Sequence, residues 1–115
     1  MEESEYVTLV ITVPVSHVDE IREALGNAGA GDVDHYSHCS FSYPGTGRFK
    51  PKSGSNPHIG KQGQMETVSE EKIQAYCKKT QLESVLDAVK KAHPYEETII
   101  DILPVYTIGM KRGRD

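Results

Sequence analysis

Hydrophobic and polar residues alternate along the first regular segment of the chain, from Tyr6 to Val13. Successive side chains of a strand point to opposite faces, so this pattern indicates a strand with one buried face. The residues on that face are Val7, Leu9, Ile11 and Val13. Pro14 follows them, and the strand is expected to end there.

The next segment places apolar residues at the spacing of a helix. Ser16 precedes Asp19 by three residues, as in a capping box, so a helix is expected to begin here. Gly29 and Gly31 are expected to end it. Its apolar stripe consists of Val18, Ile21, Leu25 and Ala28.

A second helix is predicted by the strongest helical pattern in the chain. Its apolar residues are Leu82, Val85, Leu86 and Val89. Thr80 and Glu83 repeat the capping signature. Pro94 forces the end of this helix, because the residue before a proline avoids helical geometry.

Three further segments indicate strands, and a fourth indicates a short one. Residues 35–43 alternate weakly, and residues 64–78 alternate around a polar break at 69–72 that predicts a bulge. Residues 98–103 are apolar on both faces apart from one aspartate, so this strand is expected to be central or covered. Residues 105–110 would form an extra edge strand.

Residues 44–63 are rich in Gly, Pro, Ser, Asn and Lys without any period, which predicts a long functional or mobile loop. The order of elements is then β-α-β-β-α-β. Two β-α-β halves form a four-stranded antiparallel sheet with two helices on one face, so the predicted fold is an α+β, ferredoxin-like sandwich. We expect one domain over residues 1–115, with 1–5 and 111–115 flexible.

The composition narrows the class of partner. The chain has 115 residues, of which 37% are hydrophobic, and a net charge of −4. Nucleic acids and anionic membranes select basic faces, so neither is expected to be the main partner. Two cysteines, an acidic first segment and the lack of an apolar run of ~20 residues predict a cytoplasmic protein without disulfides, signal peptide or membrane span.

The first candidate for chemistry is the glycine-containing run 45–50. Gly45 and Gly47 would let backbone amides point into a concavity, and Arg48 and Lys50 add positive charge. Such a loop suits an anion such as a phosphate or a carboxylate. It lacks the ending of a P-loop and leads into no helix, so a flexible or oligomer-contacting turn is the alternative.

The second candidate is a metal site built from His35, His38 and Cys39. Imidazole and thiolate groups bind zinc or copper. On a strand, His38 would point away from the other two, and a further ligand such as His58 or Cys77 would have to come from elsewhere. The alternative is a polar strand edge with a buried thiol.

The third candidate is the segment that closes the second helix, which contains His93, Tyr95, Glu96 and Glu97. His93 can complement the helix dipole, and Tyr95 is expected to pack. The two glutamates point apart if they begin a strand, so they are poor as an acid/base pair. A functional role requires one of them to meet a partner from elsewhere, such as a basic residue of the 45–50 run.

Two of these segments together resemble a known family. The likeness lies in the run 93–97 and in Gly45, Thr46, Gly47, Arg48, Phe49, Lys50, Pro51, Gly54, Asn56, Pro57, His58, Ile59, Gly60, Gly63, Met65 and Glu66. These residues look like the inserted domain of the Ngg-interacting-factor-like family, the YqfO group. The run 93–97 is also similar to a segment of the divalent-cation tolerance protein CutA.

The resemblance implies a CutA-like and PII-like fold and assembly as a trimer. It identifies the chain as the inserted domain occurring alone. Full-length members carry a two-metal site in flanking domains, so the resemblance transfers no metal ligand to this chain.

Three functions stay open. The favoured one is a small regulatory or assembly module that self-associates and binds a small anion or metal at subunit clefts. The second is a divalent-cation protein of the copper type, for which the available ligands are His35, His38, Cys39, His58 and His93. The third is a hydrolase-associated domain, although kinship of fold by itself warrants no activity. The sequence predicts no catalytic residue and leaves the cofactor and any protein partner unknown.

Overall fold

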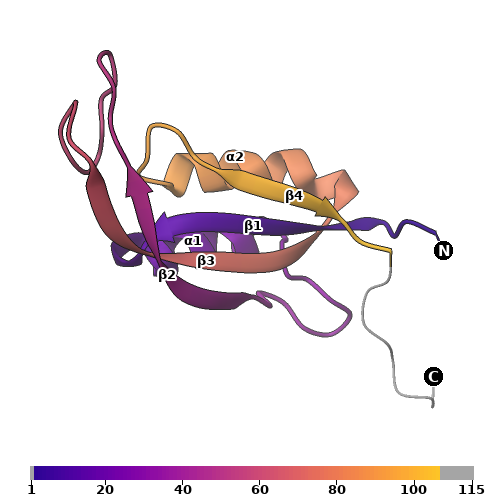
Figure 1. Cartoon of the computed structure of the whole chain (residues 1–115). Coiled ribbons are helices and arrows are strands. Elements are labelled where there is room, and N and C mark those ends of the chain that lie inside the picture. Colours follow the sequence, from indigo (N-terminus) through magenta and orange to yellow (C-terminus); the bar gives the residue numbers. More distant parts are fainter. Residues whose placement is uncertain (1, 107–115) are drawn as a thin grey trace.

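The computed structural model describes residues 2–106. Within that range the elements are β1 (Tyr6–Pro14), α1 (Val18–Asn27), β2 (Phe41–Phe49), β3 (Glu66–Lys78), α2 (Leu82–Ala92) and β4 (Ile100–Pro104). Two 3-10 turns, η1 (Val15–His17) and η2 (Lys79–Gln81), lead into the helices. The strands form one antiparallel sheet in the order β2-β3-β1-β4, with both helices on one side (Figure 1). This arrangement confirms the predicted α+β, ferredoxin-like fold.

The core lies between the sheet and the helices. The register sets Leu9 opposite Ala75 and Ile11 opposite Ile73, so the apolar residues of β1 and β3 face the same way. The predicted apolar face of β1 is buried, and the helix residues that pack in the same cluster are Val18, Ile21, Leu25, Val85 and Val89. The other side of the sheet is covered by neither helix, and we call it the open face.

The helices begin differently from the prediction. Neither helix has a side-chain hydrogen bond at its N-cap, so the two predicted capping boxes are wrong. The Ser16 hydroxyl bonds Nδ1 of His17 at 2.8 Å instead. The turns η1 and η2 lead the chain into each helix, which displaces Ser16 and Thr80 from the cap position. The predicted end of α1 is confirmed, because Gly29 adopts φ +109°, a conformation that favours glycine.

Strand β2 runs over Phe41–Phe49 rather than over residues 35–43, so the first third of the predicted loop is sheet. Residues 35–40 are irregular, and His38 has a positive φ of 59°. The prediction failed because Pro44 and two glycines look like loop residues. Strand β2 lies at an edge of the sheet, where a proline, which has no N–H to donate, is tolerated.

Strand β3 is continuous, so the predicted bulge is wrong. Its register with β2 runs without a break from Glu66 opposite Phe49 to Gln74 opposite Phe41. Pairing with β1 begins only at Glu70, which lies opposite Pro14. The residues before Glu70 pair with β2 alone. This explains why they are polar although the strand continues through them.

Strand β4 begins at Ile100 and lies at the other edge of the sheet, so of the two predicted alternatives it is not central, and that it is covered stays a prediction. Its apolar residues Ile102 and Leu103 are exposed within the described chain, as is Ile99 before it. Of the predicted strand 105–110, Val105 and Tyr106 are not in a strand, and residues 107–110 lie outside the described range.

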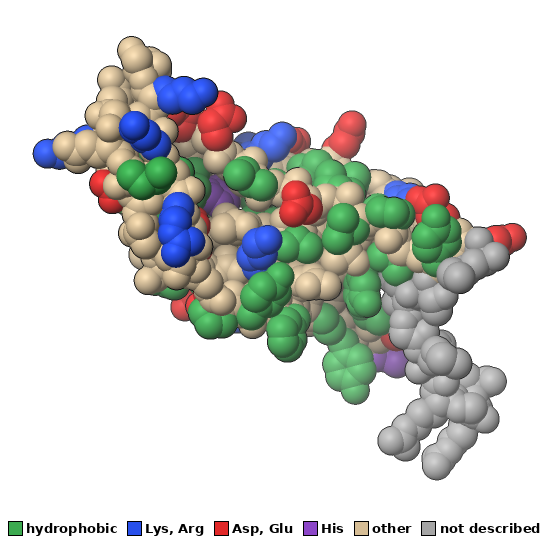
Figure 2. Space-filling model, in the orientation of Figure 1, with side chains coloured by type: hydrophobic (Ala, Val, Ile, Leu, Met, Phe, Trp, Pro, Cys, Tyr) green, Lys and Arg blue, Asp and Glu red, His purple; other side chains and the backbone are tan. Residues whose placement is uncertain are grey.

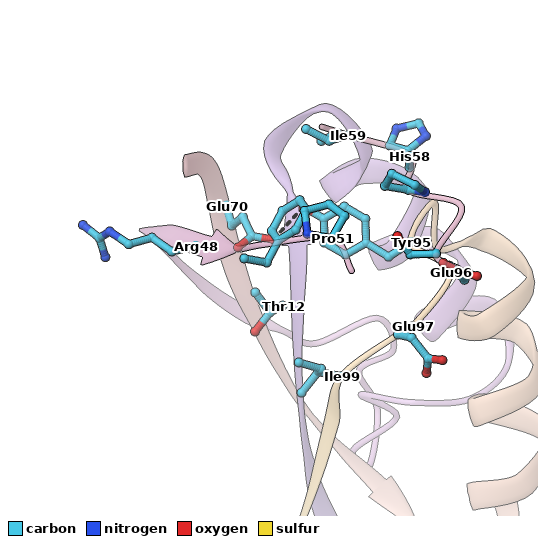
Figure 3. A pocket seen from close by; sticks show the side chains of 13 residues that line it. Thr12, Arg48, Pro51, His58, Ile59, Glu70, Tyr95, Glu96, Glu97 and Ile99 are labelled. Carbon is cyan, nitrogen blue, oxygen red and sulfur yellow. Dashed lines mark hydrogen bonds between the residues drawn. The ribbon is translucent and has the colours of Figure 1, made fainter. Parts of the chain in front are cut away.

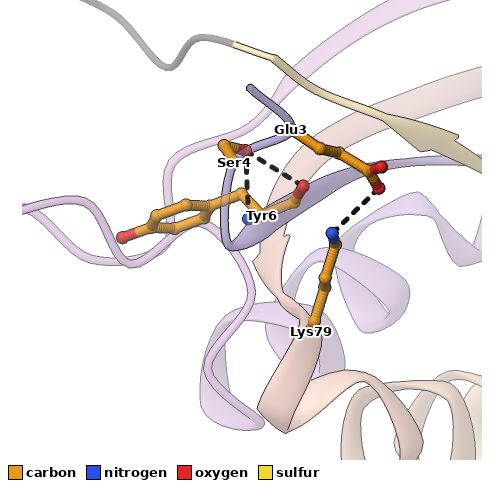
Figure 4. A network of polar contacts seen from close by, with 4 residues as sticks. All are labelled: Glu3, Ser4, Tyr6 and Lys79. Atoms are coloured by element: carbon orange, nitrogen blue, oxygen red, sulfur yellow. Dashed lines mark hydrogen bonds and ion pairs between the residues drawn. The ribbon is translucent and has the colours of Figure 1, made fainter. Parts of the chain in front are cut away.

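The chain before β1 is held beside the end of β4. The backbone N–H of Ser4 donates to the carbonyl oxygen of Val105 at 2.7 Å, and the Lys79 ammonium contacts the Glu3 carboxylate at 2.9 Å (Figure 4). No helix within residues 2–106 is long and apolar enough to cross a membrane.

The packing of α1 on the sheet can be tested at Ile21, whose side chain is fully buried. Ile21→Ala removes buried carbons and leaves a cavity, so we expect the free energy of unfolding in urea to fall by about 2–5 kcal/mol. Glu20→Ala, at the exposed neighbouring position, is the matched control and should change it by less than about 0.5 kcal/mol. Equal effects of the two substitutions would contradict this packing.

Candidate functional site

His93 anchors the segment that connects α2 to β4. Its backbone N–H donates to the carbonyl oxygen of Val89 at 2.8 Å and closes the last turn of the helix. Its Nε2 bonds the carbonyl oxygen of Thr12 at 2.8 Å, and its Nδ1 bonds the backbone N–H of Tyr95 at 3.1 Å. A carbonyl only accepts and a backbone N–H only donates, so the imidazole is neutral with its proton on Nε2.

The environment of His93 favours this neutral form. The residue is 7% exposed, and burial lowers the pKa of its imidazole below the usual value of 6.5. The hydrogen bond to Thr12 and the charge of Glu70 act in the opposite direction, with smaller effects on that pKa. His93 therefore ties α2 to β1 through hydrogen bonds rather than through a charge at the helix end.

Tyr95 lies over the open face and is paired with a buried carboxylate. Its hydroxyl donates to Oε2 of Glu70 at 2.8 Å. Burial raises the pKa of the Tyr95 hydroxyl well above its usual value of 10, and the hydrogen bond and charge of Glu70 raise it further. The phenol therefore keeps its proton and donates a hydrogen bond, so it is poorly suited to act as a base.

Gly47 leaves room for the Glu70 carboxylate. A Cβ atom at Gly47 would overlap Oε1 of Glu70, whereas a Cβ atom at Gly45 would have no other atom within 4 Å. Both glycines have ordinary negative φ values and lie in β2, so they do not form the predicted anion-binding loop. The sequence singled out Gly47, but its role here is to let a carboxylate pack against the strand.

A cavity of about 310 Å³ opens beside this pair, between the end of the sheet and the loop that joins β2 to β3 (Figure 3). We call it the sheet-end cavity. Its lining residues are Thr12, Arg48, Phe49, Pro51, Ser55, Pro57, His58, Ile59, Glu70, Tyr95, Glu96, Glu97 and Ile99. The structure thus brings together the 93–97 segment and the chain that follows Gly47, which the sequence treated as two candidates.

The loop is held against the 93–97 segment by one hydrogen bond and by aromatic contacts. The backbone N–H of Asn56 donates to Oε2 of Glu96 at 2.9 Å. The ring of Tyr95 has its centroid 5.9 Å from that of Phe49 and 6.5 Å from that of His58. These contacts form one wall of the sheet-end cavity.

The predicted ion pair between the 45–50 run and the two glutamates is not formed in the described structure. Arg48 lines the cavity, but its guanidinium points away from Tyr95 and Glu96 (Figure 3). The ion pairs within residues 2–106 are Arg22 with Asp19 and Lys79 with Glu3. Glu96 and Glu97 lie in the bend before β4, which begins at Ile100, so they do not begin a strand as the prediction of opposed side chains assumed.

The predicted metal ligands are dispersed. His38 uses both ring nitrogens, with Nε2 bonded to Oδ1 of Asn27 and Nδ1 to the Ser37 hydroxyl, each at 3.0 Å. His58 lies at the sheet-end cavity, while Cys77 is buried in the core. Within residues 2–106 no group of three or more His, Cys, Asp or Glu side chains could hold a metal ion.

Two important residues of the site, Glu70 and Thr12, were absent from the sequence-based candidates. One sequence signal could have indicated Glu70: the alternation of β3 continues through the polar stretch and places Glu70 on the same face as Gln74. The partner of Glu70 is 25 residues away in the sequence. No local pattern could have indicated Tyr95 as that partner.

No family model matches the chain. Over 105 residues, 91% of its length, the chain is 49% identical to a protein of Halalkalibacterium halodurans named GTP cyclohydrolase 1 type 2 homolog. It is 43% identical to the Bacillus subtilis protein of the same name. The chain spans about 28% of the length of these curated relatives.

The chain is also similar to solved structures. A crystal structure of a Bacillus cereus protein related to NIF3 matches 91% of this chain and 27% of its own, with a TM-score of 0.77 and 41% identity. CutA of Archaeoglobus fulgidus matches 92% of this chain and 88% of its own, with a TM-score of 0.63 and 20% identity, which shows the fold alone. These similarities support the resemblance seen in the sequence and place the chain among CutA-like folds.

The role of Gly47 is testable with a matched pair of substitutions. Gly47→Ala displaces the Glu70 carboxylate and breaks its bond to Tyr95, so the free energy of unfolding should fall by about 1–3 kcal/mol. Gly45→Ala, two residues earlier on the same strand, meets no other atom and should be neutral or slightly stabilising. Urea unfolding measures both, and equal losses would contradict the assigned contact.

The neutral state of His93 predicts a dependence of stability on pH. Its pKa is lowered in the folded chain, so the unfolded chain binds more protons as the pH falls through about 6.5. The free energy of unfolding should therefore decrease between pH 7.5 and pH 5.5. His93→Gln should weaken this decrease, whereas His35→Gln, at an exposed position, should retain it. An unchanged slope in His93→Gln would exclude His93 as its source.

Proposed function

We propose that this chain is a small self-associating module of regulatory or assembly type, which forms a homotrimer and binds a small ligand in a cleft. The observation that carries the proposal is a group of large apolar side chains that are exposed on the open face. Phe41 is 68% exposed, and three more large side chains on this face are also exposed: Tyr43, Tyr76 and Leu103.

The register places these side chains together. Thr8 lies between Tyr76 and Leu103 across three strands, and Gln74 lies opposite Phe41 in the next row. Hydrophobic side chains gather over the strands on this side of the molecule (Figure 2). Soluble monomers rarely expose large groups of apolar side chains, which supports the burial of these side chains by a second copy of the chain.

The edges of the sheet support the same proposal. Strands β2 and β4 each pair on one side only within residues 2–106, which leaves a row of backbone groups on the other side. Such edges are templates for pairing with another chain. The exposed apolar residues of β4 would be covered by an assembly, which agrees with the expectation that this strand is covered. The resemblance to CutA-like domains favours a trimer among the possible assemblies.

The relatives suggest a setting for this module. Those matched here are named GTP cyclohydrolase 1 type 2 homologs, and this chain corresponds to about 28% of their length. We infer an accessory role in assembly or ligand binding rather than a role in the reaction that the name denotes. The sheet-end cavity is the natural place for the ligand, because it combines apolar walls with a buried carboxylate.

Light scattering coupled to size exclusion tests the assembly. At micromolar concentration the mass should be about three times the 12.7 kDa of one chain. Phe41→Lys places a charge in the apolar face and should lower the mass, because burying an unpaired charge is costly. Val15→Lys changes a residue that is 51% exposed but lies in η1, and it should leave the mass unchanged. A monomeric wild-type chain would overturn the proposal.

A further inference from the structure

We propose that the sheet-end cavity binds a small organic cation, an ammonium group carried on a compact apolar body. This inference deepens the ligand-binding part of the proposed function and rests on it. It differs from the anion that the sequence suggested, because three of the four residues with full charges that line the cavity are glutamates.

The walls of the cavity define the apolar part of the ligand. They are formed by Phe49, Pro51, Pro57, Ile59 and Ile99 together with the ring of Tyr95. The volume of about 310 Å³ is at the small end of the range of ligand pockets. It is roughly the volume of ten water molecules, which suits a single ring and a short side chain.

Glu70 defines the charged part. The residue is 7% exposed, and among the residues that the structure describes only Tyr95 donates a hydrogen bond to its carboxylate. That bond engages Oε2, while Oε1 lies over Gly47. A carboxylate accepts up to about four hydrogen bonds, and a buried one is stabilised by a positive partner. Among the described residues no cation lies within ion-pair distance of Glu70, so a ligand ammonium would supply the positive partner.

The neighbouring charges favour a cation as well. Glu96 and Glu97 also line the cavity, and Glu96 accepts one backbone hydrogen bond from Asn56. The basic residue of the lining, Arg48, directs its guanidinium away from them (Figure 3). The lining therefore holds three carboxylates against one guanidinium, so its charges favour a cation over an anion.

The aromatic side chains add a further favourable contact. Phe49, His58 and Tyr95 line the cavity with neighbouring rings. A cation near the face of an aromatic ring is attracted by its quadrupole, and the effect grows when water is excluded. Apolar walls, aromatic rings and a buried carboxylate together select a protonated amine over a neutral or anionic molecule of the same shape.

The test uses three probes that share one ring and differ in charge: benzylamine, which is protonated at pH 7, benzyl alcohol and benzoate. Titrations of the full chain are followed by NMR. We expect saturable shifts for Thr12, Tyr95 and Ile99 with benzylamine, at a dissociation constant on the order of 1 mM for so small a ligand. Benzyl alcohol should bind at least tenfold more weakly, and benzoate should not saturate.

Two substitutions assign the binding to this site. Glu70→Gln keeps the shape and an acceptor for Tyr95 but removes the charge, and it should weaken benzylamine binding at least tenfold. If this variant does not fold, Glu97→Gln, at an exposed position, should weaken binding severalfold. Glu23→Gln, on the exposed side of α1, is the matched control and should bind as the wild type does.

The results separate this inference from the proposed assembly. Tighter binding of benzoate than of benzylamine, or the lack of saturable benzylamine binding, would overturn the cation site. An unchanged affinity in folded Glu70→Gln, or in Glu97→Gln where Glu70→Gln does not fold, would overturn it as well. A trimer that does not bind benzylamine would leave the assembly intact and reject the ligand class. A monomer that binds benzylamine would reject the assembly and support the ligand class.

Discussion

The structure depends on the staggered pairing of β3 with its two neighbours. Strand β3 pairs with β2 from Glu66 to Gln74 and with β1 from Glu70 to Lys78. The hairpin of β2 and β3 therefore extends past the end of β1, and Glu70 lies at the step where β1 stops. The sheet-end cavity forms at this step, because the sheet loses one strand there and the loop after β2 lies over the gap (Figure 3).

The segment 93–97 joins this step to the helical layer. His93 connects the end of α2 to β1 through its neutral ring, and Tyr95, two residues later, reaches Glu70 on the open face. The same short run thus ends a helix, fixes the position of that helix on the sheet and supplies one wall of the cavity. A substitution at His93 would affect the cavity through Tyr95, because the imidazole accepts a hydrogen bond from the backbone N–H of Tyr95.

The two faces of the sheet have different relations to solvent. One is covered by α1 and α2 and contains the aliphatic core, while the open face exposes aromatic and aliphatic side chains and contains the cavity at one end. Because the cavity and the apolar patch share a face, an assembly that covers the patch would bring a second copy close to the cavity. Ligand binding and self-association would then be linked through a common surface.

Periodicity in the sequence determined the order of elements, the buried face of β1 and the apolar stripes of both helices, because these depend on neighbours two to four residues apart. It placed β2 wrongly. Pro44 and the two glycines after it can belong to a strand only because β2 lies at an edge of the sheet, and the sequence does not show that position. The sequence also identified Gly47, Tyr95 and Glu96 without their partners. Only the tertiary structure decided that Glu70 fills the space over Gly47 and accepts from Tyr95, because pairing across the sheet sets contacts between residues far apart in the chain.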